Sequence, residues 1–269
     1  MTDAEFRRIS TLVKDRYGID LTNKAAIVEG RLNNTLFREG FQSYTDYLNA
    51  VEQDSTGEME KEMVNILTTN HTYFMREFDH LDFLRETILP YLKEKEASSK
   101  DLRIWCAASS TGEEPYMIAM TILQFFGFEH AGWDTKILAT DISTNALESA
   151  IRGEYSLEAV EKVSEQWKRR FFKEIPGENR VRVTDEVKNE VLFRQFNLME
   201  PLPFRKKMHT VFMRNVMIYF DQPTKNDLVK RVYDAIEPGG YLIIGMTEAI
   251  DTSVAPFEMV SPSIFRKPL

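Results

Sequence analysis

Two adjacent acidic residues, Glu113 and Glu114, occupy the place in the sequence where a nucleotide-binding fold forms its first ligand loop. Residues 104–106 (Ile-Trp-Cys) are typical of a short buried strand, and the small residues at 107–112 indicate a tight turn. An apolar helical pattern then begins at Pro115, a residue type that suits the first turn of a helix. The stretch therefore predicts a strand, a small-residue loop and a helix, which is the first βα unit of a nucleotide-binding α/β domain.

The charge of this loop indicates the class of ligand. A loop that binds pyrophosphate is rich in glycine and presents free backbone N–H groups at the positive end of a helix. Glu113 and Glu114 would repel a phosphate there and attract a cation. We infer a cofactor with an adenosine part, a cationic amino group and no phosphate, which points to S-adenosylmethionine (SAM). The alternative is structural: Ser110 with Glu113, and Thr111 with Glu114, fit capping boxes, so both glutamates could serve only the helix start.

Further polar residues follow the strands predicted downstream. Asp141 ends the second strand, where an acid accepts hydrogen bonds from ribose hydroxyls in dinucleotide-binding folds. Asn197 follows the third strand, and its amide can offer adenine both a donor and an acceptor. Arg214 and Asn215 end the fourth strand. Alternatively, Asp141 could cap the following helix, and the two asparagines could be ordinary turn residues.

A polar run, Asn70-x-Thr72-x-x-x-Arg76, precedes the α/β pattern. On the residues alone, Asn70 or Thr72 could cap a helix and Arg76 could form a surface ion pair. The residue types therefore leave the role of this run open.

Together these segments resemble one family. Residues 109–116 (Ser-Ser-Thr-Gly-Glu-Glu-Pro-Tyr) are similar to the signature of the chemotaxis receptor methyltransferases, the CheR family. The other matches lie in the family's order and extend the resemblance to nearly the whole chain: Asn70-x-Thr72-x-Phe74-x-Arg76, Ala139-Thr-Asp-Ile142, Asn197-Leu198 and Arg214-Asn-Val-Met-Ile-Tyr-Phe220. The resemblance implies transfer of a methyl group from SAM to glutamate side chains in the cytoplasmic domain of methyl-accepting chemoreceptors, with S-adenosylhomocysteine as the product.

The resemblance also implies site residues. Those expected to bind the cofactor are Asn70, Thr72, Arg76, Glu114, Asp141, Asn197, Leu198, Arg214 and Asn215. We further expect Arg76 to orient the incoming carboxylate or the cofactor, and Tyr219 to line the methyl-transfer pocket. A glutamate acceptor is already ionised near pH 7, so no strong general base is needed. The four histidines show no ligand-like spacing with Cys106, and no metal site is predicted.

Apolar periodicity divides the chain into two domains. Residues 1–85 show helical patterns with stops at Gly18 and Gly40, which predicts an all-α domain. Residues 86–269 alternate strands with helices, which predicts an α/β, Rossmann-like SAM-dependent methyltransferase domain with a mostly parallel sheet. Residues 167–192 break this alternation and predict the small antiparallel β-subdomain that the family inserts here. Strands are expected at 102–106, 136–140, 191–196, 210–214, 240–245 and, antiparallel, near 263–266.

Composition limits the class of protein. Hydrophobic residues make up 43% of the chain and charged residues 28%, which is ordinary for a globular protein. The net charge of −8 argues against broad nucleic-acid binding. A single cysteine cannot form an internal disulfide, no stretch is apolar enough to enter a membrane, and the N-terminus does not resemble a signal peptide. We therefore expect a cytoplasmic protein, acting as a monomer.

Receptor recognition is expected to rest on the helical domain. Arg31 and Arg38 are seven residues apart, close to two helical turns, and so should share one face toward an acidic receptor. The turn at 174–179 is short, which argues against a loop that binds a receptor-tail peptide. Two other hypotheses are a SAM-dependent enzyme with another protein or small-molecule acceptor, and a non-catalytic binding module. The intact cofactor motifs weaken the binding module, while the helical domain and the insertion argue against a small-molecule enzyme.

Overall fold

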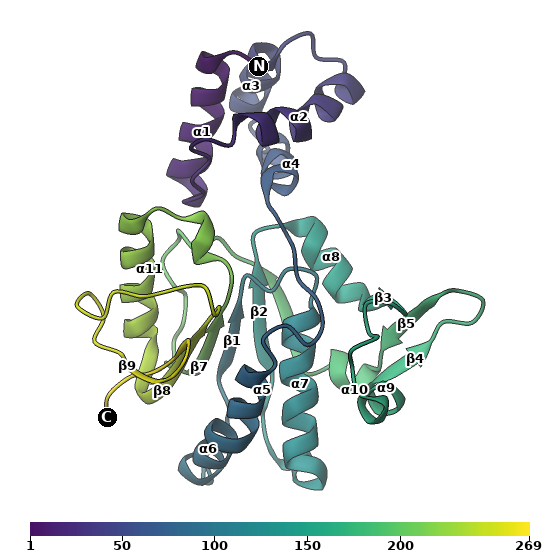
Figure 1. Ribbon diagram of the computed structural model, residues 1–269, viewed down its shortest axis with the longest axis vertical. Coiled ribbons are helices and arrows are strands. Elements are labelled where there is room, and N and C mark those ends of the chain that lie inside the picture. The colour runs from purple at the N-terminus through teal and green to yellow at the C-terminus, as the bar shows by residue number, and fades with distance from the viewer.

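The computed structural model describes residues 1–269, and the chain begins as a bundle of four helices (Figure 1). These helices are α1 (Asp3–Tyr17), α2 (Ala25–Glu39), α3 (Tyr44–Gln53) and α4 (Glu58–Leu67). Thr2 and Glu5 form a capping box at the start of α1, and Gly18 ends the helix in a left-handed conformation. Leu32 and Leu48 are fully buried in the core of the bundle. The predicted all-α domain is therefore confirmed.

The chain leaves this bundle earlier than the sequence pattern suggested. Three short segments, α5 (Asp79–Phe83), the π-helical η1 (Leu84–Ile88) and α6 (Leu89–Lys95), follow one another without a break. Their side chains, Leu84 and Leu92 among them, pack in the core of the α/β domain, whereas the bundle core ends at Leu67. These contacts favour a domain boundary near residue 68 over the expected boundary at residue 85. A helical period reveals a helix, but it does not reveal which core buries that helix.

The second domain contains a seven-stranded sheet with the order β6-β2-β1-β7-β8-β10-β9. The parallel strands are β1 (Ile104–Ala107), β2 (Ile137–Asp141), β6 (Val191–Gln195), β7 (Met208–Met213) and β8 (Ile236–Ile244). The last two strands, β10 (Ile264–Arg266) and β9 (Glu258–Ser261), run antiparallel at one edge. The Rossmann-like fold class and all six expected strands are confirmed, and β9 is an additional strand that the sequence did not reveal.

Helices cover both faces of this sheet, which explains why its central strands β1 and β7 are buried along their whole length. Ile104 and Cys106 of β1 belong to the core on one face, with α7 (Glu113–Phe126). Trp105 and Ala107 belong to the core on the other face, with α11 (Gln222–Ala235). The remaining elements near the sheet are η2 (Gly127–Gly132), α8 (Thr144–Arg152) and η3 (Met217–Tyr219).

A three-stranded antiparallel sheet projects from the side of the domain (Figure 1). Its strands are β3 (Glu154–Ser156), β4 (Phe172–Glu174) and β5 (Arg180–Val183), in the order β3-β5-β4, with the short helices α9 (Glu165–Phe171) and α10 (Asp185–Lys188) beside them. The subdomain is confirmed, but its expected bounds of 167–192 are wrong. It begins at Glu154, and residues 191–195 form β6, which pairs in parallel with β2. A short apolar run such as residues 191–195 could form a strand of the small sheet or of the main sheet. Only its pairing with β2 shows that it belongs to the main sheet.

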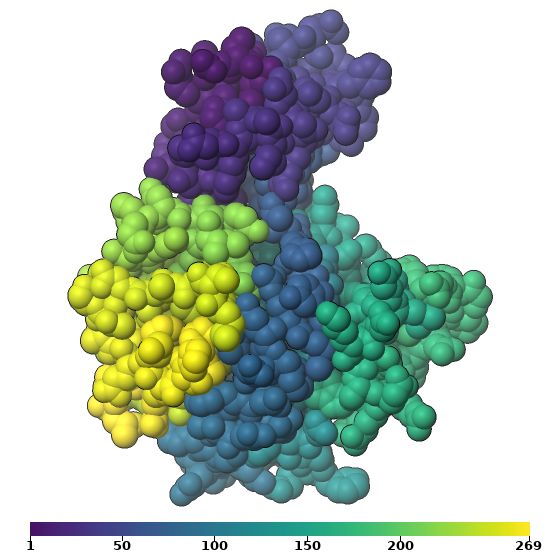
Figure 2. Space-filling model, viewed as in Figure 1, coloured from purple at the N-terminus to yellow at the C-terminus, as the bar shows by residue number.

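The helical domain forms a separate lobe at one end of the molecule (Figure 2). Several contacts join it to the α/β domain, three of them polar side-chain contacts of α1 and α4. The Asn65 amide donates to Thr144 at 2.8 Å, the Asn197 amide donates to the Arg16 carbonyl at 2.8 Å, and Lys14 pairs with Asp221 at 2.9 Å. No helix of the structure is both long enough and apolar enough to cross a membrane.

His80, on α5, is expected to make stability depend on pH. Its Nε2 lies 2.7 Å from the Ser263 hydroxyl, and its Nδ1 has no hydrogen-bond partner. Burial, followed by the positive charge of Arg214, lowers the pKa of His80 from 6.5 to about 4. The unfolded state therefore binds a proton at His80 more readily than the folded state does. The contribution of the neutral ring to the free energy of unfolding is complete above pH 6.5 and is lost as the pH falls toward 4.

Acidification from pH 7 to 4.5 should therefore lower the free energy of unfolding by about 2–3 kcal/mol through this one residue. His80→Gln should flatten this dependence in urea titrations. It should not abolish it, because burial also lowers the pKa of His209. The exposed His71, changed to Gln, serves as the control for loss of an imidazole. An unchanged slope in His80→Gln would contradict the assignment.

Candidate functional site

A pocket of about 430 Å³ lies where the carboxyl ends of the parallel strands meet the helical domain. Its walls include Ser110 after β1, Asp141 at the end of β2 and Arg214 after β7. The strand order reverses between β1 and β7, because the chain proceeds to β2 and β6 on one side and to β7 and β8 on the other. Such a switch point is where open α/β sheets bind ligands. The volume suits a small molecule of cofactor size.

The loop between β1 and α7 packs closely against helix α8. Gly112 precedes α7 with a φ of +97°, and a Cβ there would lie 2.9 Å from that of Ala150. No side chain caps α7, so the predicted capping boxes are wrong. Ser110 instead donates its hydroxyl hydrogen to the Asn70 carbonyl at 3.1 Å, and Thr111 donates to Glu113 at 2.6 Å. The loop shape therefore depends on Gly112 and on the contact with Asn70, which lies in the linker (residues 68–78) between α4 and α5.

The two glutamates of this loop do different things. Glu113 is buried outside the pocket, and burial raises its pKa. Glu114 lines the pocket, and its carboxylate pairs with Arg214 at 2.8 Å. The charge that a ligand would meet here therefore comes from Glu114, the residue selected from the sequence.

Arg214 is the buried centre of an ion-pair group. It also pairs with Glu77 at 3.1 Å and donates to the Arg76 carbonyl at 2.6 Å. Burial opposes ionisation of Glu77, but the charge and hydrogen bonds of Arg214 lower the pKa of Glu77 below its usual value. Two carboxylates thus face one guanidinium, which leaves this end of the pocket negative and favourable to a cationic group. Glu77 was not identified from the sequence, because its partner lies 137 residues away.

Asp141 lies at the end of β2 with a relative exposure of 5%. One carboxylate oxygen accepts from the backbone N–H of Ser110 at 2.8 Å, and the other accepts from that of Ser143 at 2.9 Å. Burial raises the pKa of Asp141, against the effect of these hydrogen bonds. Each oxygen retains capacity to accept another hydrogen bond, so the carboxyl group can receive ligand hydroxyls. The alternative role as helix cap falls to Ser143, whose hydroxyl accepts from Ala146.

The linker residues Asn70, Thr72 and Arg76 all line the pocket. Arg76 donates to the His71 carbonyl at 2.8 Å, and its guanidinium lies 5.6 Å from the centre of the Tyr73 ring. No carboxylate pairs with Arg76, so the surface ion pair considered as its alternative role is absent. Its charge is available to a ligand.

Two of the residues after β6 and β7 also line the pocket, Asn197 and Tyr219. The Asn197 side chain makes two contacts within the protein: its amide donates to the Arg16 carbonyl, and its oxygen accepts from the Met199 N–H at 3.0 Å. One amide N–H and one oxygen lone pair remain, so the expected contact with adenine stays a prediction. The neighbouring Leu198 lines the pocket as an apolar contact, and Asn215 lines it beside Arg214.

The helical domain contributes part of the wall, including Lys24, Ile27 and Arg31, which the sequence did not indicate. Lys24 lies 5.7 Å from the centre of the Tyr219 ring. Arg31 donates to the Leu67 carbonyl at 2.6 Å and to the Thr68 carbonyl at 3.0 Å, at the end of α4. The expectation that Arg31 points toward a receptor is thus wrong, because its side chain serves the carbonyl end of a neighbouring helix.

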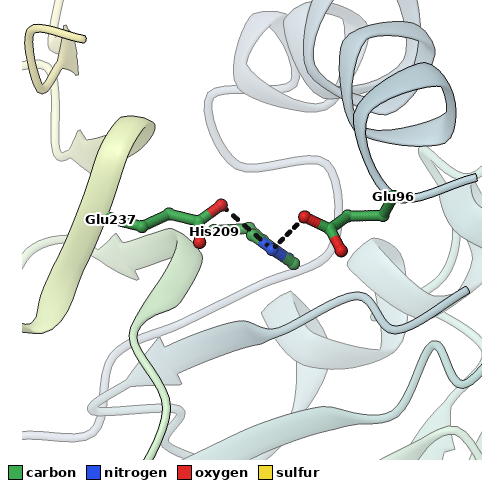
Figure 3. A group of neighbouring side chains, drawn as sticks. All are labelled: Glu96, His209 and Glu237. Carbon is green, nitrogen blue, oxygen red and sulfur yellow. Dashed lines mark ion pairs between the residues drawn. The ribbon is translucent and has the colours of Figure 1, made fainter. Parts of the chain in front are cut away.

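A second group of ionisable side chains lies away from this pocket, at the start of β7. Glu96 and Glu237 approach Nε2 of the buried His209 at 3.3 and 3.1 Å (Figure 3). The Arg103 backbone N–H donates to Nδ1 of His209, and the Arg103 guanidinium lies 2.6 Å from Nε2, so both ring nitrogens already face donors of Arg103. A metal would need the lone pair of Nε2, and the Arg103 guanidinium already lies between these groups. The group therefore serves as a buried salt-bridge network and not as a metal centre.

The donor set of the pocket fits SAM. A negative end at Glu114 and Arg214 suits an ammonium group, Asp141 suits ribose hydroxyls, and the remaining wall is largely apolar.

Comparisons with known proteins agree with this chemistry. The family model described as the all-alpha domain of CheR methyltransferases matches residues 4–68, and the model described as their SAM binding domain matches residues 70–265. A chemotaxis protein methyltransferase from Borreliella burgdorferi is 37% identical and covers 99% of this chain and 95% of its own length. The corresponding proteins from Salmonella typhimurium (36% identical, 98% of this chain, 90% of that protein) and Escherichia coli (38%, 92% and 85%) are similarly related.

The motifs, the two-domain fold and the pocket thus lead to one conclusion. The chain belongs to the CheR methyltransferase family and is a SAM-dependent methyltransferase.

Proposed function

We propose that this protein transfers a methyl group to glutamate side chains in the cytoplasmic domain of methyl-accepting chemoreceptors. The observation that supports it most directly is a pocket shared by both domains, with a cation-attracting carboxylate at one side and the unpaired Arg76 at another. The relatives from Borreliella burgdorferi and Salmonella typhimurium are chemotaxis protein methyltransferases, and the match with this chain covers 95% and 90% of their length. We place the reaction in the cytoplasm and assign it to a monomer.

At the cofactor end, Asp141 would accept the ribose hydroxyls, and Glu114 would hold the ammonium group with its orientation set by Arg214. Asn70, Thr72, Leu198 and the other pocket residues expected from the sequence would complete the site. Bound SAM supplies a methyl group that is activated by the adjacent sulfonium.

At the acceptor end, Arg76 and Tyr219 would position the incoming carboxylate. The acceptor is ionised near pH 7, and no group needs to remove a proton. The chain's contribution is therefore alignment and exclusion of water, and good alignment can lower a barrier by roughly 7–11 kcal/mol. Arg76 would orient the acceptor without gripping both oxygens, because a tight bidentate pair would stabilise the ground state as well.

Receptor docking would rest on the helical domain through exposed groups other than Arg31. Arg38 stays exposed, although it pairs with Glu39 and Glu62 on the surface, so its share is small. The turn between β4 and β5 spans residues 175–179 and closes with a hydrogen bond between Ile175 and Arg180. So short a turn supports recognition without a bound receptor-tail peptide.

The test of this function is transfer of labelled methyl groups. Purified protein, incubated with methyl-tritiated SAM and receptor-containing membranes of the source organism, should label a receptor-sized band. Base treatment should release the label as methanol, because carboxyl methyl esters are base-labile. Label that resists base, or that goes to small molecules, would favour the alternative of a SAM-dependent enzyme with another acceptor.

The Asp141→Asn variant should bind S-adenosylhomocysteine about 10- to 100-fold more weakly, since it loses a charge-assisted acceptor worth about 1.5–3 kcal/mol. Isothermal titration calorimetry measures this directly. Asp251→Asn is a matched control, because its carboxylate also accepts a backbone N–H two residues ahead at 2.9 Å, in an exposed loop outside the pocket. Equal affinity in the Asp141 variant and the control would remove Asp141 from the site.

The Arg76→Ala variant should fold normally yet lose at least 90% of its methyl-transfer rate. Its side chain makes one hydrogen bond, to the His71 carbonyl, so its removal should shift the melting temperature by no more than a few degrees. Arg85→Ala, a change at an arginine that pairs with Asp82 outside the pocket, is the control. A normal initial rate for Arg76→Ala would show that the acceptor is oriented by other groups.

A further inference from the structure

Glu248, in the loop after β8, has an unusual set of contacts. Its carboxylate accepts from the backbone N–H of Asn215 at 2.7 Å, of Met217 at 2.8 Å and of Gly245 at 2.7 Å. No lysine or arginine pairs with it, and it does not line the pocket. Three backbone donors from two chain segments therefore converge on one carboxylate, as in the anion-binding concavities that successive N–H groups form.

The segment held in this way is the part of the pocket wall that follows β7. Asn215 has a φ of +56°, a conformation that few residues other than glycine adopt. Met217 begins the short helix η3, which ends at Tyr219. Asn215, Val216, Ile218 and Tyr219 line the pocket, so the backbone bonds to Glu248 lie directly behind that wall.

Gly245, directly after β8, also packs tightly against this loop. A Cβ at this position would lie 2.4 Å from the Asn215 side-chain nitrogen and 2.9 Å from a Glu248 carboxylate oxygen. The Asn215 amide also approaches Glu77 at 3.4 Å, which ties its side chain toward Arg214. The ends of β7 and β8 are thus packed closely around the Glu248 carboxylate.

We propose that Glu248 is a positioning residue, which holds the backbone of residues 215–219 so that Tyr219 and Asn215 face the pocket. It touches neither the cofactor nor the acceptor, and its role rests on the methyl-transfer function proposed above. Burial raises the pKa of Glu248 in spite of its backbone hydrogen bonds, so the ionised group is held at a net cost of desolvation. An apolar residue at this place would leave the N–H groups of Asn215, Met217 and Gly245 without their acceptor, so this loop conformation depends on the carboxylate.

The two carboxylate oxygens hold different parts of the loop, which allows a selective variant. One oxygen accepts from Asn215 and Gly245, and the other accepts from Met217. In Glu248→Gln the amide oxygen can keep the first two donors, but the amide NH₂ then faces the Met217 N–H. The variant should therefore release η3 and Tyr219 while leaving Asn215 in place.

We expect Glu248→Gln to bind S-adenosylhomocysteine within twofold of wild type and to keep its KM for SAM, while kcat for methyl transfer falls at least tenfold. Hydrogen–deuterium exchange should increase at residues 216–219. Gly245→Ala should in addition lower the affinity for S-adenosylhomocysteine at least fivefold, because a Cβ there displaces Asn215 as well as crowding the Glu248 carboxylate. Asp54→Asn is the matched control, because Asp54 accepts the backbone N–H groups of Thr56 and Met59 far from the pocket.

A merely structural role would lower the melting temperature of Glu248→Gln but leave kcat normal at temperatures where the protein is folded. That result, with unchanged exchange at 216–219, would overturn the proposal. Wild-type protein that fails to methylate receptors would count against the proposed function instead. The exchange and affinity measurements need no receptor, so in that case they still decide whether Glu248 holds this loop.

Discussion

The ion pairs of Arg214 are the interaction on which the rest of the site depends. Arg214 is almost completely buried, and it joins Glu114 at the start of α7, Glu77 in the linker and the Arg76 carbonyl. Three segments that are far apart in the sequence are thereby fixed around one guanidinium. Removal of one member of such a buried group typically costs about 3–5 kcal/mol, because it leaves an uncompensated charge. The same arrangement leaves one carboxylate in excess around Arg214, and this excess makes that end of the pocket favourable to a cationic group.

The pocket lies between two domains, and this placement connects acceptor recognition with the chemistry. Lys24 and Ile27 of the helical domain line the same pocket as Asp141 and Arg214. The Tyr219 carbonyl accepts from the Asp20 N–H at 2.8 Å, so the wall that would meet the acceptor is also bonded to the helical domain. A receptor helix docked on that domain would therefore lie close to the point of methyl transfer. The helical domain therefore forms part of the pocket wall.

Two half-buried carboxylates, Glu77 and Glu248, support this site from behind, outside the pocket lining. Glu77 fixes the side chains of Arg214 and Asn215, and Glu248 fixes the backbone of the same loop. Both would have been assigned to the surface from their residue type, since glutamate is rarely buried unless it is paired. Their partners are a guanidinium and backbone N–H groups that come near only in the folded chain.

The sequence by itself determined the fold class, the helical domain, the strands of the main sheet and the chemical nature of the cofactor. These follow from local information: the apolar period of each segment, the glycine stops at Gly18 and Gly40, and polar residues at the ends of strands. The pairing of Glu114 with a cation, the burial of Glu113 and the structural use of Asn197 were not accessible in this way. Each depends on residues that lie far away in the sequence and come close only in the folded chain.

The tertiary structure alone decided where each domain ends and which polar side chains face the pocket. The helix after residue 78 has the same apolar period as the bundle helices, yet it packs in the α/β core, because the core that buries a helix is set by contacts between distant segments. Arg31 has the right helical spacing for a docking face, but the carbonyl end of α4 lies beside it and takes its donors. Periodicity specifies the face that is buried, whereas the partner of a charged side chain depends on long-range packing, which no local pattern records.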